Sequence, residues 1–404
     1  DIDGKYEIKV SPGVYKVSVS YVGYAGRQQK VVVSDRSVVL DFQLDPALLA
    51  LDEVVVTSAS RAETILLEVP AAITRIDQSD IEQLRIWDQR GMTSLSGNLN
   101  VSNPGEGDAI NYGIRGVLSL DFNPSVATYI DGINQFDVYS NIEFLHDIES
   151  IEILKGPQGT LFGRNAMGGA INIKTRSPTN NLRVNAETSF GNFNLQRYTL
   201  SASGAILKDK LFFKIAGLSG QQDGFFTNIV DNSNINAKDY SGLSGGLLLD
   251  ISDKWSVELN GKIYEREISG YVGYAATDSI ALANPFEVTQ DSPGSSRHAL
   301  NQTALKLAFS GRSFNFSNIL SYQSSILDYD QVDIDFTPLD LNTFTRPIAG
   351  TDNVTSVITN EFNFSNAANV DKIKWVAGSY AFRQRLPINQ IVGTGADAAG
   401  FAPT

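Results

Sequence analysis

The second half of the chain alternates apolar and polar residues, segment after segment, without a helical repeat. In the segment 255–266, the odd-numbered residues from Trp255 to Ile263 are apolar or glycine, whereas the even-numbered residues from Ser256 to Lys262 are polar. A two-residue repeat is typical of strands with one apolar and one polar face. Nine segments show this two-residue repeat: 182–190, 195–206, 210–220, 239–251, 255–266, 302–310, 313–326, 354–365 and 372–385.

The connections between these segments alternate in length after the first one. Short turns at one end of the strands and long loops at the other are typical of an outer-membrane β-barrel. A soluble sandwich has no reason to separate its loop lengths in this way. We therefore expect an incomplete antiparallel transmembrane β-barrel over residues 179–404. The short connections are 208–209, 252–254, 311–312 and 366–371, and the long ones are 221–238, 267–301 and 327–353.

Composition excludes several other classes of protein. The formal net charge of -13 argues against a nucleic-acid-binding surface, which needs a basic footprint for the phosphates. The absence of cysteine excludes disulfides, thiolate catalysis and cysteine-ligated metals. No run of about 18 apolar residues is present, so the sequence contains no candidate transmembrane helix.

A glycine-rich stretch, residues 148–175, precedes the alternating half. It reads IESIEILKGPQGTLFGRNAMGGAINIKT, which predicts a strand, a tight loop and a second strand. A phosphate-binding P-loop needs Gly-x-x-x-x-Gly-Lys-Ser/Thr. Here Gly163 and Gly168 have the right spacing, but Gly169 stands where the lysine is required. The glycines therefore favour close backbone packing over nucleotide binding.

This stretch resembles the end of the plug domain of TonB-dependent outer-membrane receptors. The shared marks are the Ile-Glu-x-Ile-Glu-Ile strand, the Lys-Gly-Pro loop and the Ile-Asn-Ile strand, and Tyr112-Gly-Ile-Arg-Gly116 resembles an earlier plug strand. The resemblance implies an α+β plug domain over residues 61–178, inside the barrel. Plugged transporters have about 22 strands, so nine strands make an incomplete barrel, and we expect a fragment truncated at both ends.

Local signals inside residues 61–178 agree with a compact α+β domain. Residues 73–76 read as a strand, and Ser79 with Glu82 forms a capping box at the start of a helix. A second short helix is expected over 88–99. Asp131-Gly132 is a strong signal for a tight hairpin turn.

The N-terminal part, residues 1–46, predicts a small β-sandwich. Strands are expected at 6–10, 14–22, 31–33 and 38–44, separated by glycine, proline and aspartate. The Pro-Gly-Val-Tyr and Tyr-Val-Gly-Tyr sequences resemble the later part of a carboxypeptidase-regulatory-like domain. Because such domains accompany zinc peptidases, His146, Glu149 and His298 were weighed as zinc ligands, but no peptidase fold surrounds them. No metal site is expected.

The linker 47–60 contains an extended, β-branched segment. It is either an ordinary strand or a segment that adds itself to the sheet edge of another protein. Its position matches the TonB box of the resembled family, so the resemblance favours recruitment of TonB in the periplasm. The residues concerned are Asp52, Glu53, Val54, Val55, Val56 and Thr57.

The resemblance also suggests ligand-contacting and plug-anchoring residues. The first set lies in outer loops of the plug: Asn103, Glu106, Asp108, Asn111, Tyr112, Asp121 and Asn123. Arginines inside a barrel lumen need carboxylate partners. We therefore expect plug–barrel ion pairs between Arg115 or Arg164 and the barrel residues Glu187 or Glu258, with Glu361 as a further candidate.

Together these features predict a mainly β protein of the bacterial outer membrane that is not an enzyme and has no cofactor or catalytic residue. The resemblance implies TonB-dependent transport of a scarce ligand, with a ferric siderophore as first candidate and glycan or cobalamin import as alternatives. Expected partners are TonB, outer-membrane lipid, a small-molecule ligand such as a metal chelate, and a surface lipoprotein. An unplugged porin and a soluble β-rich adhesin are the alternatives of a different class. Aspartates 328, 330, 333 and 335 and the Gly393–Ala398 segment are expected to be solvated loops.

Overall fold

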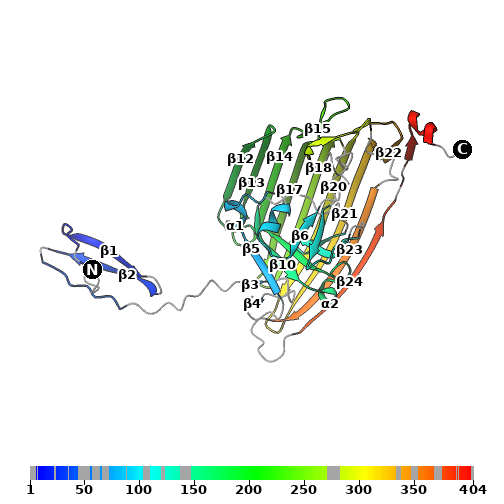
Figure 1. The fold of residues 1–404 in the computed structure, drawn as a ribbon. Helices are drawn as coiled ribbons and strands as arrows, with labels where there is room; N and C mark the ends of the chain where they lie inside the picture. Colours follow the sequence, from blue (N-terminus) through cyan, green and yellow to red (C-terminus); the bar gives the residue numbers. More distant parts are fainter. Residues whose placement is uncertain are drawn as a thin grey trace. The chain divides into compact units, whose positions relative to one another are not determined.

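A computed structural model describes most of the chain (Figure 1). The chain divides into a unit of residues 1–55 and 65–67 and a larger unit of residues 56–64 and 68–404. Among the described residues, none of the helices has the length and apolar character needed to cross a bilayer. The described residues are 6, 8–21, 24–34, 36–43, 55–56, 64–65, 72–87, 89–102, 110–119, 123–136, 147–270, 283–333, 338–346, 354–367, 375–387, 389 and 391–401.

The first unit contains one antiparallel hairpin, β1 (Gly13–Tyr21) with β2 (Tyr24–Val33). The sequence predicts further strands at 6–10 and 38–44, and this is wrong for the described residues there, which are irregular. They still contact each other, because Tyr6 Oη donates a hydrogen bond to the carbonyl of Leu40. Alternation alone therefore did not identify which segments find a pairing partner.

The central domain is built on a five-stranded sheet in the order β5-β10-β11-β8-β9. Its outer strands β5 and β9 come from distant parts of the chain, while β10 and β11 pair along the predicted stretch 148–175. A second pair, β6 with β7, lies beside it. The elements are β5 (Ala72–Asp77), α1 (Gln78–Gln83), η2 (Gln89–Ser94), β6 (Leu99–Ser102), β7 (Asn111–Ile114), β8 (Val126–Ile130), β9 (Ile133–Gln135), β10 (Ile148–Lys155), α2 (Gly159–Phe162) and β11 (Gly169–Thr175).

Two local predictions in this domain need correction. The capping box of α1 is formed by Asp77 and Asp80, two residues earlier than the predicted Ser79 and Glu82, because β5 runs directly into the helix. The predicted helix 88–99 is a shorter 3-10 helix, η2. Its Met92 is nevertheless fully buried in the main apolar cluster, as the helical spacing of apolar residues suggested.

Gly169 occupies the tightest position in this domain. Its φ of +154° lies in a region that side chains rarely adopt, and a Cβ would lie 2.2 Å from the carbonyl oxygen of Leu154. We expect Gly169→Ala to destabilise the domain by about 1–3 kcal/mol through backbone strain alone, with overpacking adding to it. Gly159→Ala in the same stretch is the control, since nothing lies within 4 Å of its Cβ. Equal thermal unfolding of the two variants would contradict this reading.

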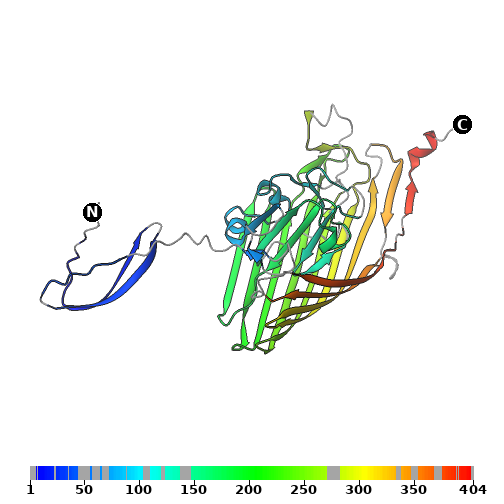
Figure 2. The ribbon, with the colours of Figure 1, turned by 90° about the horizontal axis from the view of Figure 1, so that it is seen from below.

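The alternating half forms one large curved sheet around the central domain (Figures 1 and 2). All nine predicted segments are strands, and neighbours in sequence pair antiparallel. The two that extend furthest beyond the predicted bounds are β20 and β21, whose added residues, 295–301 and 327–333, pair largely with each other. The nine are β12 (Arg183–Gly191), β13 (Leu195–Leu207), β14 (Leu211–Gln222), β17 (Ala237–Ser252), β18 (Trp255–Ser269), β20 (Ser295–Ser310), β21 (Phe314–Asp333), β23 (Val354–Asn366) and β24 (Val376–Arg385).

The outward face of this sheet carries an aromatic belt beside the short turns. Trp255 stacks near Phe309 with ring centroids 4.8 Å apart, and Phe316 lies equally close to Phe364. Phe314, 5.3 Å from Phe309, continues the row. Aromatic girdles at the edge of an apolar band are typical of membrane barrels. The belt marks the level of the membrane interface on the short-turn side.

At the other end, long connections carry short strands of their own. β15 (Phe226–Asn228) and β16 (Asn234–Ile235) lie between β14 and β17, and β19 (Glu287–Val288) lies between β18 and β20. β22 (Asn342–Arg346) pairs with β25 (Ile391–Thr394), which is followed by η4 (Ala396–Phe401). In the linker, β3 (Val55–Val56) pairs with β4 (Thr64–Ile65).

Candidate functional site

The turn between β8 and β9 brings the central domain to the wall of the large sheet. Asp131 and Gly132 both have positive φ, 51° and 84°, and Ile130 pairs with Ile133 across the turn. This geometry suits the short side chain of aspartate followed by glycine. The hairpin predicted from Asp131-Gly132 is confirmed.

The carboxylate of Asp131 is fixed by the end of β11. One oxygen accepts a hydrogen bond from the Thr175 backbone N–H at 2.8 Å, and the other accepts one from the Thr175 hydroxyl at 2.7 Å. The backbone N–H of Asp131 donates to the carbonyl of Ile173 at 2.9 Å. Asp131 is thus held in place by β11 of the central domain itself.

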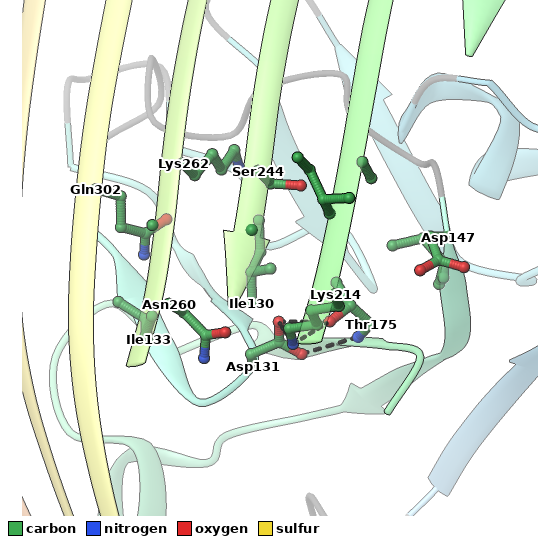
Figure 3. Close-up of a pocket in the computed structure, with 15 residues that line it drawn as sticks. Ile130, Asp131, Ile133, Asp147, Thr175, Lys214, Ser244, Asn260, Lys262 and Gln302 are labelled. Carbon is green, nitrogen blue, oxygen red and sulfur yellow. Dashed lines mark hydrogen bonds and ion pairs between the residues drawn. The ribbon is translucent and has the colours of Figure 1, made fainter. Parts of the chain in front are cut away.

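Lys214 of β14 meets this carboxylate from the lumen side of the sheet (Figure 3). Its Nζ lies 3.8 Å from Asp131 Oδ2 and 3.2 Å from Glu258 Oε1 on β18. It also lies 3.2 Å from the Thr175 hydroxyl. One barrel lysine therefore neutralises part of the charge of a central-domain aspartate and a barrel glutamate in a largely enclosed place. We call Asp131, Lys214 and Glu258 the anchor triad.

Asp131 and Lys214 border a small cavity of about 80 Å³ between the central domain and the sheet. Lys262, Asn260, Ser244 and Gln302 line it from the barrel side. Figure 3 shows these polar side chains gathered around the turn at Asp131. The cavity has room for a few water molecules, since one needs about 10–15 Å³.

A second contact lies beside the triad. Gln323 of β21 donates a hydrogen bond of 2.7 Å to the carbonyl of Asn134, and this bond is buried. Ile133 packs with Ala304 and Ile319 of the barrel. A Cβ on Gly132 would lie 2.9 Å from Ile319, so the turn fits closely against the wall. The hairpin is therefore attached by charge, hydrogen bonding and apolar packing together.

The ion pairs expected from the sequence are not the ones found. Arg115 is exposed, at a positive φ of 54°, and makes no ion pair with Glu187 or Glu258 among the described residues. Glu187 pairs instead with Arg197 of the neighbouring strand, at 3.0 Å. Glu258 pairs with Lys214 because that lysine lies nearer on the same wall. The polarity across the interface is thus reversed: the central domain supplies the carboxylate and the barrel the cation.

Arg164 does reach the barrel, though not through a carboxylate. Its guanidinium lies 5.4 Å from the ring centroid of Phe136 and 5.3 Å from that of Phe382, and the two rings contact each other with centroids 5.3 Å apart. It donates hydrogen bonds to Asn123 Oδ1 at 2.7 Å and to Gln384 Oε1 at 3.4 Å. Phe382 and Gln384 belong to β24, so Arg164 forms a second anchor with the opposite part of the described sheet.

Replacing Arg164 tests this cation–π contact. Arg164→Ala should weaken the anchor by about 1 kcal/mol, because the contact is partly exposed and lies between the values for exposed and desolvated cation–π contacts. Arg164→Lys should lose a similar amount, because lysine keeps the charge without the planar fork. The measurement is the thermal unfolding midpoint of the complete protein. Full recovery by lysine would show that charge alone matters.

A larger space of about 610 Å³ separates the domain from β12 and β13. Its lining includes Glu82, Arg85 and Arg176 of the central domain and Asn185 and Glu187 of the sheet. A cation–π contact crosses it, with the Arg197 guanidinium 5.4 Å from the Trp87 ring. Contact here is looser and more polar than at the anchor triad.

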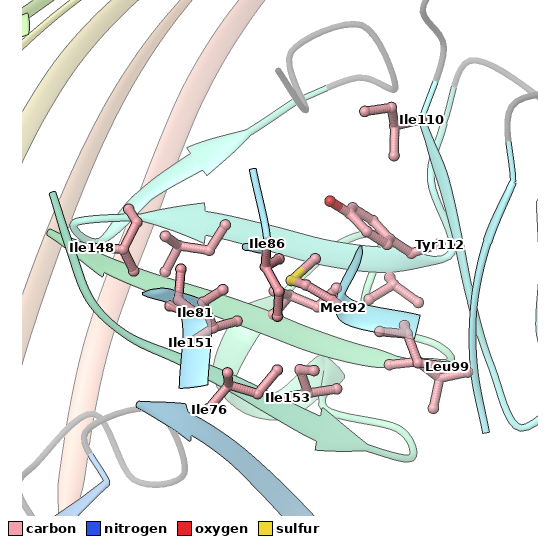
Figure 4. Close-up of a cluster of buried hydrophobic side chains, with 14 residues drawn as sticks. Ile76, Ile81, Ile86, Met92, Leu99, Ile110, Tyr112, Ile148, Ile151 and Ile153 are labelled. Carbon is pink, nitrogen blue, oxygen red and sulfur yellow. The ribbon is translucent and has the colours of Figure 1, made fainter. Parts of the chain in front are cut away.

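The predicted ligand-contacting residues divide into three groups. Asn103, Glu106, Asp108 and Asp121 lie outside the described residues. Asn123 is exposed, next to Arg164. Asn111 and Tyr112 are only 2% and 1% exposed, and Tyr112 points into the apolar cluster (Figure 4), so a direct ligand contact is wrong for these two. They belong to β7, whose side chains on both faces are covered.

Other residues singled out in the sequence take structural places. In the linker, Val55 and Val56 form β3, while Asp52, Glu53, Val54 and Thr57 lie outside the described residues. Of the three residues compared with zinc ligands, His146 lies outside the described residues. Glu149 pairs with Lys174 at 2.7 Å, and His298 is buried on β20. The described part of the chain contains no cluster of three or more metal-ligating side chains. Asp328, Asp330 and Asp333 lie in β21, and not in a solvated loop as expected; Asp333 is buried.

Sequence reasoning missed Lys214 as an anchor. Its signal was present, because Lys214 lies between the apolar Phe213 and Ile215 in an alternating strand and therefore faces the lumen. Asp131 was recognised only as a turn residue. Which lumen-facing cation meets which carboxylate depends on how deep the hairpin sits, and no local pattern encodes that depth.

Comparisons with known proteins agree with this architecture. Residues 66–170 match the TonB-dependent Receptor Plug Domain family, and residues 1–56 match the CarboxypepD_reg-like domain family. The pesticin receptor of Yersinia enterocolitica is 36% identical over 132 residues, which are 32% of this chain and 20% of that receptor. The vitamin B12 transporter BtuB of Vibrio vulnificus is 25% identical over 253 residues, 59% of this chain and 40% of BtuB.

The likeness extends to solved structures. The ferric yersiniabactin uptake receptor FyuA from Yersinia pestis superposes with a TM-score of 0.68 at 21% identity, over 80% of this chain and 49% of FyuA. At this identity the likeness establishes the fold. The chain spans less than half the length of each of these three proteins. The matched proteins are receptors and transporters, not enzymes.

Proposed function

Because this chain carries the plug domain of a TonB-dependent receptor within strands of an outer-membrane receptor barrel, we propose that it imports a scarce ligand in a TonB-dependent manner. The main support for this proposal is that Asp131, Lys214 and Glu258 attach the plug to the barrel wall. A passive porin has no use for such a domain. The proposed activity is binding and gating, without bond chemistry.

A ferric siderophore is the first candidate ligand. Support comes from the likeness to FyuA, a ferric yersiniabactin uptake receptor. The match to BtuB, a vitamin B12 transporter, keeps cobalamin as the second candidate, with glycans behind it. We take the long loops as extracellular. Exposed polar groups of the plug, Asn123 among them, are proposed to contact the ligand below these loops, which suits a small chelate.

The proposed division of the chain follows its sequence. We assign residues 1–46 to a carboxypeptidase-regulatory-like domain and residues 47–60 to the segment that couples to TonB. Residues 61–178 are assigned to the plug and residues 179–404 to the barrel. Ligand contacts are proposed at Asn103, Glu106, Asp108, Asp121 and Asn123. Asp52 to Thr57 are proposed to bind TonB by strand addition.

Uptake by the complete receptor tests the proposal. In a strain where it is the only route, radiolabelled iron should enter from at least one ferric siderophore and stop entering when a protonophore removes the proton gradient. Binding of the same siderophore to cells should be unaffected by the protonophore. Uptake of labelled cobalamin, with no iron chelate bound, would select the second candidate. Uptake that persists without the gradient would overturn the proposal.

A further inference from the structure

One buried side chain joins two of the long connections. Asn228 of β15 is 0% exposed. Its Nδ2 donates a hydrogen bond of 2.7 Å to the carbonyl of Gln290, and its Oδ1 accepts one of 3.0 Å from the N–H of Gln290. The two residues are 62 positions apart and belong to different connections. The amide of Asn228 thus occupies both polar backbone groups of Gln290, as a neighbouring strand would.

The clamp extends a small sheet shared by the same two connections. β15 pairs antiparallel with β16 of its own connection and parallel with β19 of the other. The N–H of Thr227 bonds the carbonyl of Phe286 at 2.8 Å, and that of Ile229 bonds the carbonyl of Val288 at 2.9 Å. Strands this short are marginal without further support. The buried amide of Asn228 supplies that support at the end of the pairing.

The joined connections carry a cluster of four phenylalanines. Phe225 and Phe226 have ring centroids 4.8 Å apart, and Phe286 lies 5.9 Å from Phe226. Phe193, from the β12–β13 turn, lies 5.5 Å from Phe225, and its carbonyl accepts a bond of 2.8 Å from the N–H of Asp223. Phe193 and Phe286 remain 54% and 60% exposed. The cluster combines residues from three connections.

We propose that Asn228 is a positioning residue that makes the connections 223–236 and 283–294 one body, so that the exposed phenylalanine rings meet an aromatic iron chelate, such as a ferric tris-catecholate, as a preformed surface for ring contacts. Its use in ligand capture rests on the proposed function, whereas the coupling itself does not. Ordering the surface before binding removes an entropic cost that separate loops would bear at the moment of binding. Removing the Asn228 amide would remove both of its hydrogen bonds to the buried backbone of Gln290, which is destabilising.

Hydrogen exchange in the complete receptor tests the coupling without any ligand. Asn228→Ala should speed exchange about tenfold or more in both 226–230 and 286–291, because the Gln290 N–H and carbonyl lose their bonds to the Asn228 amide and the pairing of the two connections weakens. Asn234→Ala is the matched control, since Asn234 is exposed on β16 of the same connection. Faster exchange in 226–230 alone, or in neither segment, would overturn the proposal.

A reversible cross-link separates positioning from mere folding. Thr227 and Glu287 are register partners, and the sequence has no cysteine, so Thr227→Cys with Glu287→Cys adds a single thiol pair to these 404 residues. In the Asn228→Ala background, oxidation should restore slow exchange in both segments and restore binding of a ferric tris-catecholate; reduction should reverse both. Restored exchange with unchanged binding would overturn the capture role. Failure of the unmodified receptor to bind any iron chelate would refute the proposed function and leave the exchange result standing.

Discussion

Val55→Pro is expected to abolish ligand uptake by the complete receptor while leaving ligand binding unchanged. TonB is proposed to add itself to the segment Asp52–Thr57 as a paired strand, and such pairing depends on backbone hydrogen bonds. Proline removes a backbone N–H and is excluded from strand interiors. Uptake of radiolabelled siderophore and its binding to de-energised cells are measured side by side.

β3 already pairs with one strand of this chain, and this limits how TonB could add to it. Val55–Val56 pairs with Thr64–Ile65, so one edge of the segment is occupied within the chain. TonB must then use the free edge or displace a two-residue strand, which is weakly held. Ala59→Pro, in the same linker, is the control and should transport normally. Normal transport by Val55→Pro, or equal failure of the control, would remove the assignment of this segment.

Lys214→Met is expected to lower the stability of the plug in the barrel by about 3 kcal/mol, the lower part of the range for breaking a buried ion pair. The change leaves Asp131 and Glu258 facing each other without their shared cation. The denaturant midpoint of the complete receptor should fall, and cells should become more permeable to a large hydrophilic antibiotic as the plug loosens. Lys254→Met, at an exposed turn, should change neither.

A double variant checks that the loss comes from the triad. Asp131→Asn removes one of the two carboxylates, so Lys214→Met should cost less in that background. Contacting residues commonly show coupling energies of about 0.5–3 kcal/mol in such a cycle. Strictly additive effects would mean that Lys214 stabilises the barrel alone and that the anchor lies elsewhere.

The barrel strands could be predicted because their pattern is local and repeated. Every alternating segment from 182 to 385 became a strand, and the apolar row from Trp255 to Ile263 faces outward as expected. The turn at Asp131-Gly132 was equally readable, because positive φ restricts the residue choice. Its partner Lys214 could not be assigned, since that depends on packing between two domains.

The sequence-based predictions failed where the position of a segment depends on a contact with a distant part of the chain. Residues 38–43 alternate well but find no strand to pair with among the described residues. Tyr112 looked like an outer-loop residue beside the breakers at 103–108, yet β6 pairs with β7 and draws it into the core. Asn228 gave no signal at all, because its role depends on meeting Gln290 from another connection.

If TonB pulls on the plug as proposed, the aromatic belt has a mechanical consequence. Any inward pull on the plug loads the barrel through Lys214, Glu258 and Gln384, and the membrane must supply the opposing force. Trp255, Phe309, Phe316 and Phe364 lie at the short-turn rim, which is the periplasmic side under the proposed orientation. Rings seated at the interface resist being dragged out of it. Under the proposed function, the belt would hold the barrel at a fixed depth in the membrane while the plug moves.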